Sequence, residues 1–167
     1  MTIKIIGGIA EVGDVDEFIK TMSDIARRHS VTIQALDADR TAGAEHLRFA
    51  AEKAMRSIRE GRNIAEDLGL EILLYASGKR QIERALQMGI SPGRNRIAIA
   101  IVGNDAERAG KDVMEFVQEA PVLDYNERKK DLIVKTFGIT DAEIEAVGEG
   151  KIPELVLERV ALLDIMK

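Results

Sequence analysis

The chain has 167 residues, a length typical of one compact domain, and its 46% hydrophobic and 32% charged residues exclude a disordered or fibrous protein. It has no cysteine, which excludes disulfide frameworks, thiolate metal sites and a thiol nucleophile, and favours a reducing, cytoplasmic setting. No aliphatic run approaches the roughly 20 residues of a membrane span, so we expect a soluble protein without a membrane partner.

The net charge of −5 is unevenly distributed. Residues 40–96 hold 11 Lys and Arg against 7 Asp and Glu, whereas residues 1–39 hold 4 against 7 and residues 97–167 hold 9 against 15. A basic middle between acidic ends favours a phosphate-attracting face. The alternative is that these cations only solvate helix surfaces.

Hydrophobic periodicity predicts strands and helices in alternation. The expected strands are residues 3–12, with a bulge or bend at Gly7 and Gly8, and residues 31–36, 71–76 and 96–102. Helices are expected at residues 15–28, 42–68, 79–88 and from about 106 to 118. From residue 126 onward the pattern is only helical, in short pieces separated by Gly138, Gly148, Gly150 and Pro153.

This order predicts a single α/β domain over residues 1–167. We expect a central, mixed sheet of four or slightly more strands, flanked by helices, and a helical C-terminal third. The long crossover after the second strand is consistent with parallel pairing. Residues 97–102 are apolar on both faces, which is typical of a central strand covered on both sides.

Catalytic motifs are scarce. The two histidines are His29 and His46, and His46 lies near Asp37 and Asp39, where a metal or a proton shuttle is conceivable. No third ligand stands at a metal-site spacing, and aspartates before a helix usually cap it. No nucleophile elbow, P-loop or dinucleotide fingerprint is present. We therefore expect no metal, no cofactor and no enzymatic activity.

The stretch from Tyr75 to Ile82 is the one phosphate-friendly local feature. It reads as a strand, a Ser77-Gly78 turn and the start of a helix that carries Lys79 and Arg80. Free amides at a helix N-terminus and the positive end of its dipole attract an anion. Ser-Gly is also an ordinary cap and turn, so spacing alone leaves both interpretations open.

The long helix expected at residues 42–68 places Asn63 and four arginines on one side, opposite its apolar stripe. The arginines are Arg48, Arg56, Arg59 and Arg62. Glutamates on the same side can neutralise them in pairs four residues apart. Because aromatic residues make up only 4% of the chain, we expect neither a large sequence-reading surface nor a DNA partner.

The last segment, residues 153–166, is apolar nearly all round an expected helix. Such a helix is buried on more than one face, so its second face meets either a partner protein or another helix of the same chain.

Residues 63–82, which read Asn-Ile-Ala-Glu-Asp-Leu-Gly-Leu-Glu-Ile-Leu-Leu-Tyr-Ala-Ser-Gly-Lys-Arg-Gln-Ile, resemble the TPRKB-type subunit of the KEOPS complex. Ala85, Gly89-Ile90 and the ending at residues 158–165 extend the resemblance. It is dense over about residues 35–103 and thin in the first strand and in residues 120–150. The compact length fits an archaeal member.

The resemblance implies a non-catalytic accessory subunit of the machinery that forms threonylcarbamoyladenosine next to the anticodon of certain tRNAs. It implies a PRPK-type kinase subunit and tRNA, including the CCA end, as partners. RNA contact is implied for Ser77, Gly78, Lys79, Arg80, Gln81 and Arg84, and less specifically for Arg59, Arg62 and Asn63. Partner contact is implied for Leu155, Leu162, Leu163, Ile165 and Met166, and whether this last helix contacts the kinase, the core of the chain or the tRNA end stays open.

Two alternatives stay open. One is a small α/β enzyme that binds a phosphorylated metabolite at the Ser77-Gly78-Lys79-Arg80 turn, with Asp37, Asp39 or His46 as acid or base. The other is a scaffold that binds the kinase without touching RNA.

Overall fold

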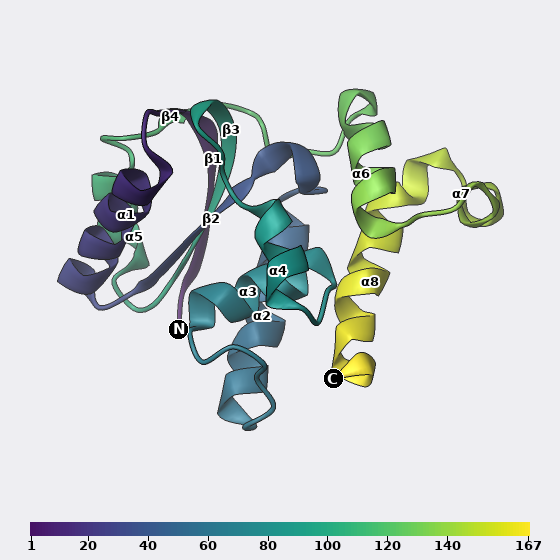
Figure 1. Ribbon diagram of the computed structural model, residues 1–167, viewed down its shortest axis with the longest axis horizontal. Helices are drawn as coiled ribbons and strands as arrows, with labels where there is room; N and C mark the ends of the chain where they lie inside the picture. The colour runs from purple at the N-terminus through teal and green to yellow at the C-terminus, as the bar shows by residue number, and fades with distance from the viewer.

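The computed structural model describes all 167 residues and contains one four-stranded sheet in the order β2-β3-β1-β4 (Figure 1). The strands are β1 (Ile3–Val12), β2 (Thr32–Asp37), β3 (Gly93–Val102) and β4 (Gln118–Glu119). All three pairings are antiparallel. The expected α/β architecture with a four-stranded sheet is confirmed, but no strands pair in parallel, contrary to the expectation from the long crossover.

Helices cover both faces of the sheet (Figure 1). One face carries α1 (Val15–His29) and α5 (Ala106–Val113); the other carries α2 (Ala44–Arg59), α3 (Leu68–Ser77) and the short α4 (Ile82–Ala85). The helical C-terminal third is confirmed. It consists of α6 (Lys130–Phe137), α7 (Asp141–Val147) and α8 (Ile152–Met166), and α8 packs against α2 and α3 on the side away from the sheet.

The sheet separates two apolar clusters. Thirteen buried residues lie between the sheet, α1 and α5, and a larger cluster of 27 joins the other sheet face to α2, α3, α8 and the C-terminal helices. In β3, Ile97, Ile99 and Ile101 belong to the first cluster and Ala98 and Val102 to the second. β3 is therefore the central strand covered on both sides that its apolar run predicts. No helix combines the length and apolar character needed to cross a bilayer.

The first helix follows its prediction closely. The Asp14 side chain accepts a hydrogen bond from the Glu17 amide at 3.2 Å and caps the N-terminus of α1. Phe18, Met22 and Ile25 form the buried stripe that the spacing predicts.

The strand expected at residues 71–76 is wrong, because these residues form most of α3. Residues Ile72 to Ala76 are each at most 2% exposed, so α3 is covered on every side and shows no helical periodicity in its sequence. A short apolar run of this kind fits a buried helix as well as a buried strand.

Several other boundaries differ from the prediction. The helix expected at residues 42–68 ends at Arg59, before an irregular segment in which Gly61 has a positive φ of 70°. The helix expected at residues 79–88 shrinks to α4 and a 3-10 turn, and that expected to reach residue 118 ends at Val113 and is followed by the unpredicted β4.

No bulge interrupts β1, whose register with β3 runs unbroken through Gly7 and Gly8. The glycines serve close packing instead. A Cβ at Gly8 would lie 2.4 Å from the Gln118 carbonyl oxygen, and one at Gly7 would lie 2.6 Å from Leu123 Cγ.

Candidate nucleic-acid and partner surfaces

The Ser77-Gly78 turn follows the C-terminus of α3 and does not itself begin a helix, because the next helix, α4, begins at Ile82. Gly78 adopts the left-handed conformation at φ 67°, and its amide donates to the Leu74 and Tyr75 carbonyls. The Lys79 amide donates to Leu74 O at 3.3 Å and to Ser77 Oγ at 3.1 Å. The amides of Gly78 and Lys79 are therefore already satisfied, so an anion at these two residues would contact side chains.

Those side chains contribute to a cleft between the α3–α4 turn and α6. We call it the basic cleft, and it is lined by Arg40, Lys79, Arg84, Gln87, Leu132, Lys135 and Thr136. Four of the seven lining residues are cationic and none is acidic. Within the chain Lys79, Arg84 and Lys135 form no ion pair, whereas Arg40 lies 3.4 Å from Asp37 and donates to Thr136 Oγ1 at 3.0 Å. The cleft therefore holds uncompensated positive charge.

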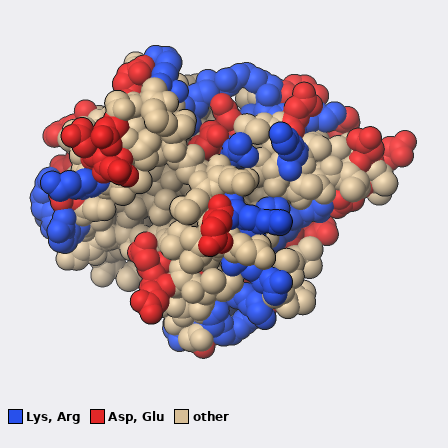
Figure 2. Space-filling view, viewed as in Figure 1, with Lys and Arg blue, Asp and Glu red and all other residues tan.

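The structure separates the other sequence-predicted RNA residues from this cleft. Arg59 is exposed at the end of α2 and lines a shallow depression beside Arg48 and Met1. Arg62 donates to the Asp164 carbonyl at 2.8 Å, and Asn63 donates to Ala65 O at 2.8 Å within its own turn. Figure 2 shows lysine and arginine gathered both near α4 and α6 and at the far end of α2.

The residues of the α3–α4 turn also differ from one another in exposure and in the contacts they make. Arg80 is exposed and donates to the Met166 carbonyl at 2.8 Å, and Gln81 is exposed at the N-cap position of α4. Ser77 is buried and donates to Leu74 O. A Cβ at Gly78 would lie 3.2 Å from the Arg159 carbonyl oxygen, so Gly78 allows α8 to pack closely on the end of α3.

The predicted partner residues on α8 split between core and surface. Leu155 and Leu163 are 5% and 0% exposed and belong to the larger apolar cluster, so the fold itself accounts for them. Leu162, Ile165 and Met166 are 40%, 79% and 46% exposed. These three form the exposed apolar end of α8, which has no covering element within the chain.

A buried polar cluster fixes this end of α8 against α2 and α3. Lys167 Nζ lies 2.7 Å from Glu71 Oε2 and 2.7 Å from the Tyr75 hydroxyl, and it also contacts Ser57. The other oxygen of Glu71 accepts hydrogen bonds from the amides of residues 64 and 65 at 3.0 and 2.9 Å. Single-sequence reasoning missed this cluster because its members lie up to 110 residues apart.

Asp164 belongs to the same cluster. Burial disfavours its charged form, but hydrogen bonds from Lys53 Nζ, at 2.7 Å, and from the Tyr75 hydroxyl outweigh burial and keep the pKa of Asp164 below its ordinary value. For Tyr75, burial and the hydrogen bond to Asp164 raise the pKa. The end of α8 is thus held by satisfied charges beside Arg62 and Arg80.

The groups that an acid–base mechanism would use are engaged in structural contacts. His46 Nδ1 accepts from the Ala42 amide at 3.0 Å and Nε2 donates to Ala76 O at 2.8 Å, and burial lowers the His46 pKa to about 4. Burial raises the pKa of Asp37, whose side chain accepts from the Asp39 amide. Asp39 itself pairs with Arg96 at 3.0 Å. No group of three or more histidines and carboxylates has a geometry that would hold a metal ion.

Comparison with known proteins identifies the family of the chain. Residues 10–164 match the family described as kinase binding protein CGI-121. The regulatory protein Cgi121 of Methanocaldococcus jannaschii is 32% identical over 138 residues, which cover 80% of this chain and 84% of that protein. The TPRKB-type family indicated by residues 63–82 is therefore confirmed: the chain belongs to the CGI-121 family of kinase-binding proteins.

Proposed function

We propose that this chain is a non-catalytic KEOPS subunit that binds a PRPK-type kinase and recruits tRNA, including its CCA end, for formation of threonylcarbamoyladenosine. The basic cleft carries the RNA part of this proposal. Its unpaired Lys79, Arg84 and Lys135 surround a cleft of 440 Å³ with no acidic lining. Membership of a kinase-binding family carries the kinase part.

The proposed RNA site keeps Lys79 and Arg84 from the sequence-based prediction and adds Arg40 and Lys135. Phosphates would contact the side chains of Lys79, Arg84 and Lys135 rather than the amides of Gly78 and Lys79, because those two amides already bond to carbonyls and to a hydroxyl. Arg40, though paired with Asp37, adds a fourth cation to the same wall. Neutralising several phosphates releases counterions, so tRNA affinity should fall steeply as salt rises.

The first experiment is a titration of the purified chain with intact tRNA and with tRNA trimmed of its CCA end, at two salt concentrations. The test variant is Lys79→Glu with Arg84→Glu. The control is Lys20→Glu with Lys111→Glu, two exposed cations on α1 and α5 that form no ion pair and lie on the opposite side of the sheet. We expect the test variant to lose about tenfold or more in affinity for intact tRNA and the control to match the parent chain.

Equal binding of both tRNAs would refute recruitment of the CCA end. Unchanged binding by a folded test variant would remove the basic cleft as the RNA site. A nucleotide or sugar phosphate that raises the melting temperature in a saturable way would instead favour the small-enzyme alternative, because a ligand of the folded state stabilises it by mass action.

The kinase part is tested separately at the exposed end of α8. We expect Leu162→Asp with Ile165→Asp to abolish retention of the chain by an immobilised PRPK-type kinase while tRNA affinity changes by less than about twofold. Both side chains are substantially exposed, so the variant should fold. Kinase binding that survives the substitution would place the kinase elsewhere on the chain.

A further inference from the structure

An apolar groove lies on the side of the molecule away from the exposed end of α8. We call it the β2 groove. It has a volume of 400 Å³ and runs between α1, on one side of the sheet edge, and α3 with the turn after α4 on the other. Most of its lining is apolar, and its floor is formed by residues Ile33, Gln34 and Ala35 of β2. Figure 2 shows it as an uncharged hollow between α1 and the α3–α4 region.

The floor of the groove is an open sheet edge. β2 is the outermost strand on its side and pairs only with β3. No backbone hydrogen bond joins residues Thr32–Asp37 to any segment outside the sheet. A side-chain amide meets the edge instead: Gln34 Nε2 donates to the Ala35 carbonyl at 3.0 Å. An uncovered edge of this kind is a template for another strand.

The walls of the groove expose large apolar side chains. Ile19, on α1, is 50% exposed, and Leu86, on the facing wall, is 56% exposed. Both belong to the small set of exposed large hydrophobic residues of this chain, and they face one groove. Apolar surface gathered around an open strand edge is typical of a binding site.

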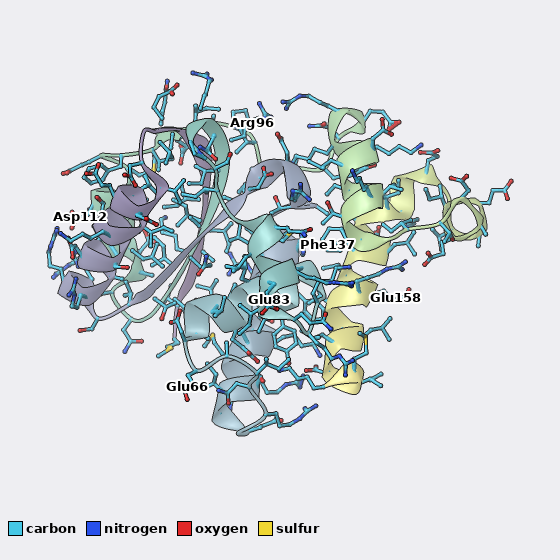
Figure 3. The ribbon with its side chains drawn as sticks, viewed as in Figure 1. Glu66, Glu83, Arg96, Asp112, Phe137 and Glu158 are labelled. Atoms are coloured by element: carbon cyan, nitrogen blue, oxygen red, sulfur yellow. The ribbon has the colours of Figure 1, made fainter.

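Charge around the groove is predominantly negative. Asp67 lies in the lining, Glu66 precedes it, and Asp16 and Glu17 stand beside the lining residues at the start of α1. Glu83 precedes Leu86 by one helical turn. None of these five carboxylates forms an ion pair within the chain, and Lys20 is the only cation adjacent in sequence to a lining residue. Figure 3 labels Glu66 and Glu83 near the groove.

We propose that the β2 groove is a docking site for an extended segment of a partner protein. The segment adds a strand to the free edge of β2, places alternate apolar side chains between Ile19 and Leu86, and carries lysine or arginine at its ends. An extended chain fits because only a strand pairs with edge N–H and C=O groups, while its alternating side chains reach the groove. Basic flanks follow from the unpaired carboxylates.

The probe is a displayed library of random peptides, each about 12 residues long so that it spans the edge of β2, selected against the whole chain. We expect enriched peptides that alternate apolar residues and carry net positive charge. A synthetic copy of the best peptide should bind at least about tenfold more weakly to Leu86→Asp and to Ile19→Asp, and equally to the control Val147→Asp, an exposed apolar residue of α7 outside the groove. Methylation of alternate backbone nitrogens in the peptide should abolish binding, since those amides pair with β2.

Three results would overturn the proposal. They are a selection without enrichment, enriched peptides whose binding ignores both groove substitutions, and enriched peptides that bind as helices and tolerate backbone methylation. Sedimentation of the free chain could give a fourth result that contradicts the proposal. If it forms a dimer that Leu86→Asp dissociates, a second copy occupies the groove. Circular dichroism of both groove variants confirms their fold, which the exposure of Ile19 and Leu86 favours.

Discussion

At the scale of single residues, Lys129 is an unusual buried cation. Its side chain is 1% exposed, and Nζ donates to the carbonyls of Thr41, Val122 and Leu123 at 3.1, 2.8 and 2.9 Å. Burial lowers the Lys129 pKa to about 8. Lys129 therefore ties the loop before α2 to the loop after β4.

We predict that Lys129→Met lowers the free energy of unfolding by about 2 kcal/mol, because three carbonyls lose their donor although the apolar stem is kept. Urea unfolding monitored by circular dichroism measures the change. The control is Arg128→Met, whose side chain is 59% exposed and pairs with Asp39 at 3.7 Å, and it should change stability by less than about 0.5 kcal/mol. Equal effects of the two substitutions would contradict the role given to Lys129.

The two histidines should titrate in opposite directions from the ordinary pKa of 6.5. His29 places one ring nitrogen 2.7 Å from Asp112 and the other 2.8 Å from Asp105, and these hydrogen bonds raise its pKa. Burial lowers the pKa of His46 to about 4. Proton NMR of the imidazole C–H signals should show one midpoint above 6.5 and one near 4. Two midpoints close to the ordinary value would contradict both sites.

These shifts also give a pH dependence of stability. The contribution of His29 is fully present below 6.5 and is lost as pH rises through its raised pKa, because the folded state holds that proton more tightly. His46 acts on the other side: its contribution is present above 6.5 and is lost as pH falls towards 4. We therefore predict that His29→Asn destabilises the chain more at about pH 5.5 than at about pH 9, as measured by urea unfolding at both pH values.

At the scale of elements, glycine governs how β4 joins the sheet. A Cβ at Gly8 would stand 2.4 Å from Gln118 O and 2.6 Å from Val117 Cγ1. We predict that Gly8→Ala displaces β4 and lowers the free energy of unfolding by about 2 kcal/mol or more. Gly13→Ala is the matched control, since no atom lies within 4 Å of the position that its new methyl group would take, and should be close to neutral. Equal urea midpoints for both variants would show that β4 accommodates the added methyl group without a loss of stability.

The elements also show what sequence alone predicts. β1, α1, β2 and β3 have patterns set by one buried face or by burial on both faces, so local periodicity locates them. The sequence of α3 predicts a strand because it lacks a polar face. Even Glu71 is buried, and its side chain accepts hydrogen bonds from the amides of residues 64 and 65. The burial of α3 depends on contacts with segments far away along the chain, so no local sequence signal specifies this helix.

The same limit applies to the candidate site. Lys79 and Arg84 are predictable because they lie in one recognisable stretch, but Arg40 and Lys135 complete the basic cleft from segments far away along the chain. Arg62 and Arg80 share the charge of the cleft residues, yet they donate to carbonyls at the end of α8. Sequence identifies a cation, and the fold determines whether it is free to bind phosphate.

At the scale of the whole molecule, we predict that residues 1–167 unfold as one unit. The larger apolar cluster joins Leu36 and Ala98 of the sheet to Phe137 of α6 and Val160 of α8, so the sheet and the C-terminal helices share one core. Far-UV circular dichroism and tyrosine absorbance should give coincident urea transitions.

Lys167 provides a direct test of whether the chain unfolds as one cooperative unit. Its side chain is 6% exposed and pairs at 2.7 Å with Glu71, which is 0% exposed, so Lys167→Met leaves a buried carboxylate without its cation. We predict a loss of about 3 kcal/mol, with both transitions shifting together. The control is Lys151→Met at the opposite end of α8, where an exposed pair with Glu154 at 3.9 Å should contribute about 0.5 kcal/mol or less. If the helical signal shifted while amide hydrogen exchange in β3 did not change, α8 would be melting alone and the sheet would be a separate unit. If both moved together, the contact between α8 and α3 would be holding the sheet and the C-terminal helices in one cooperative fold.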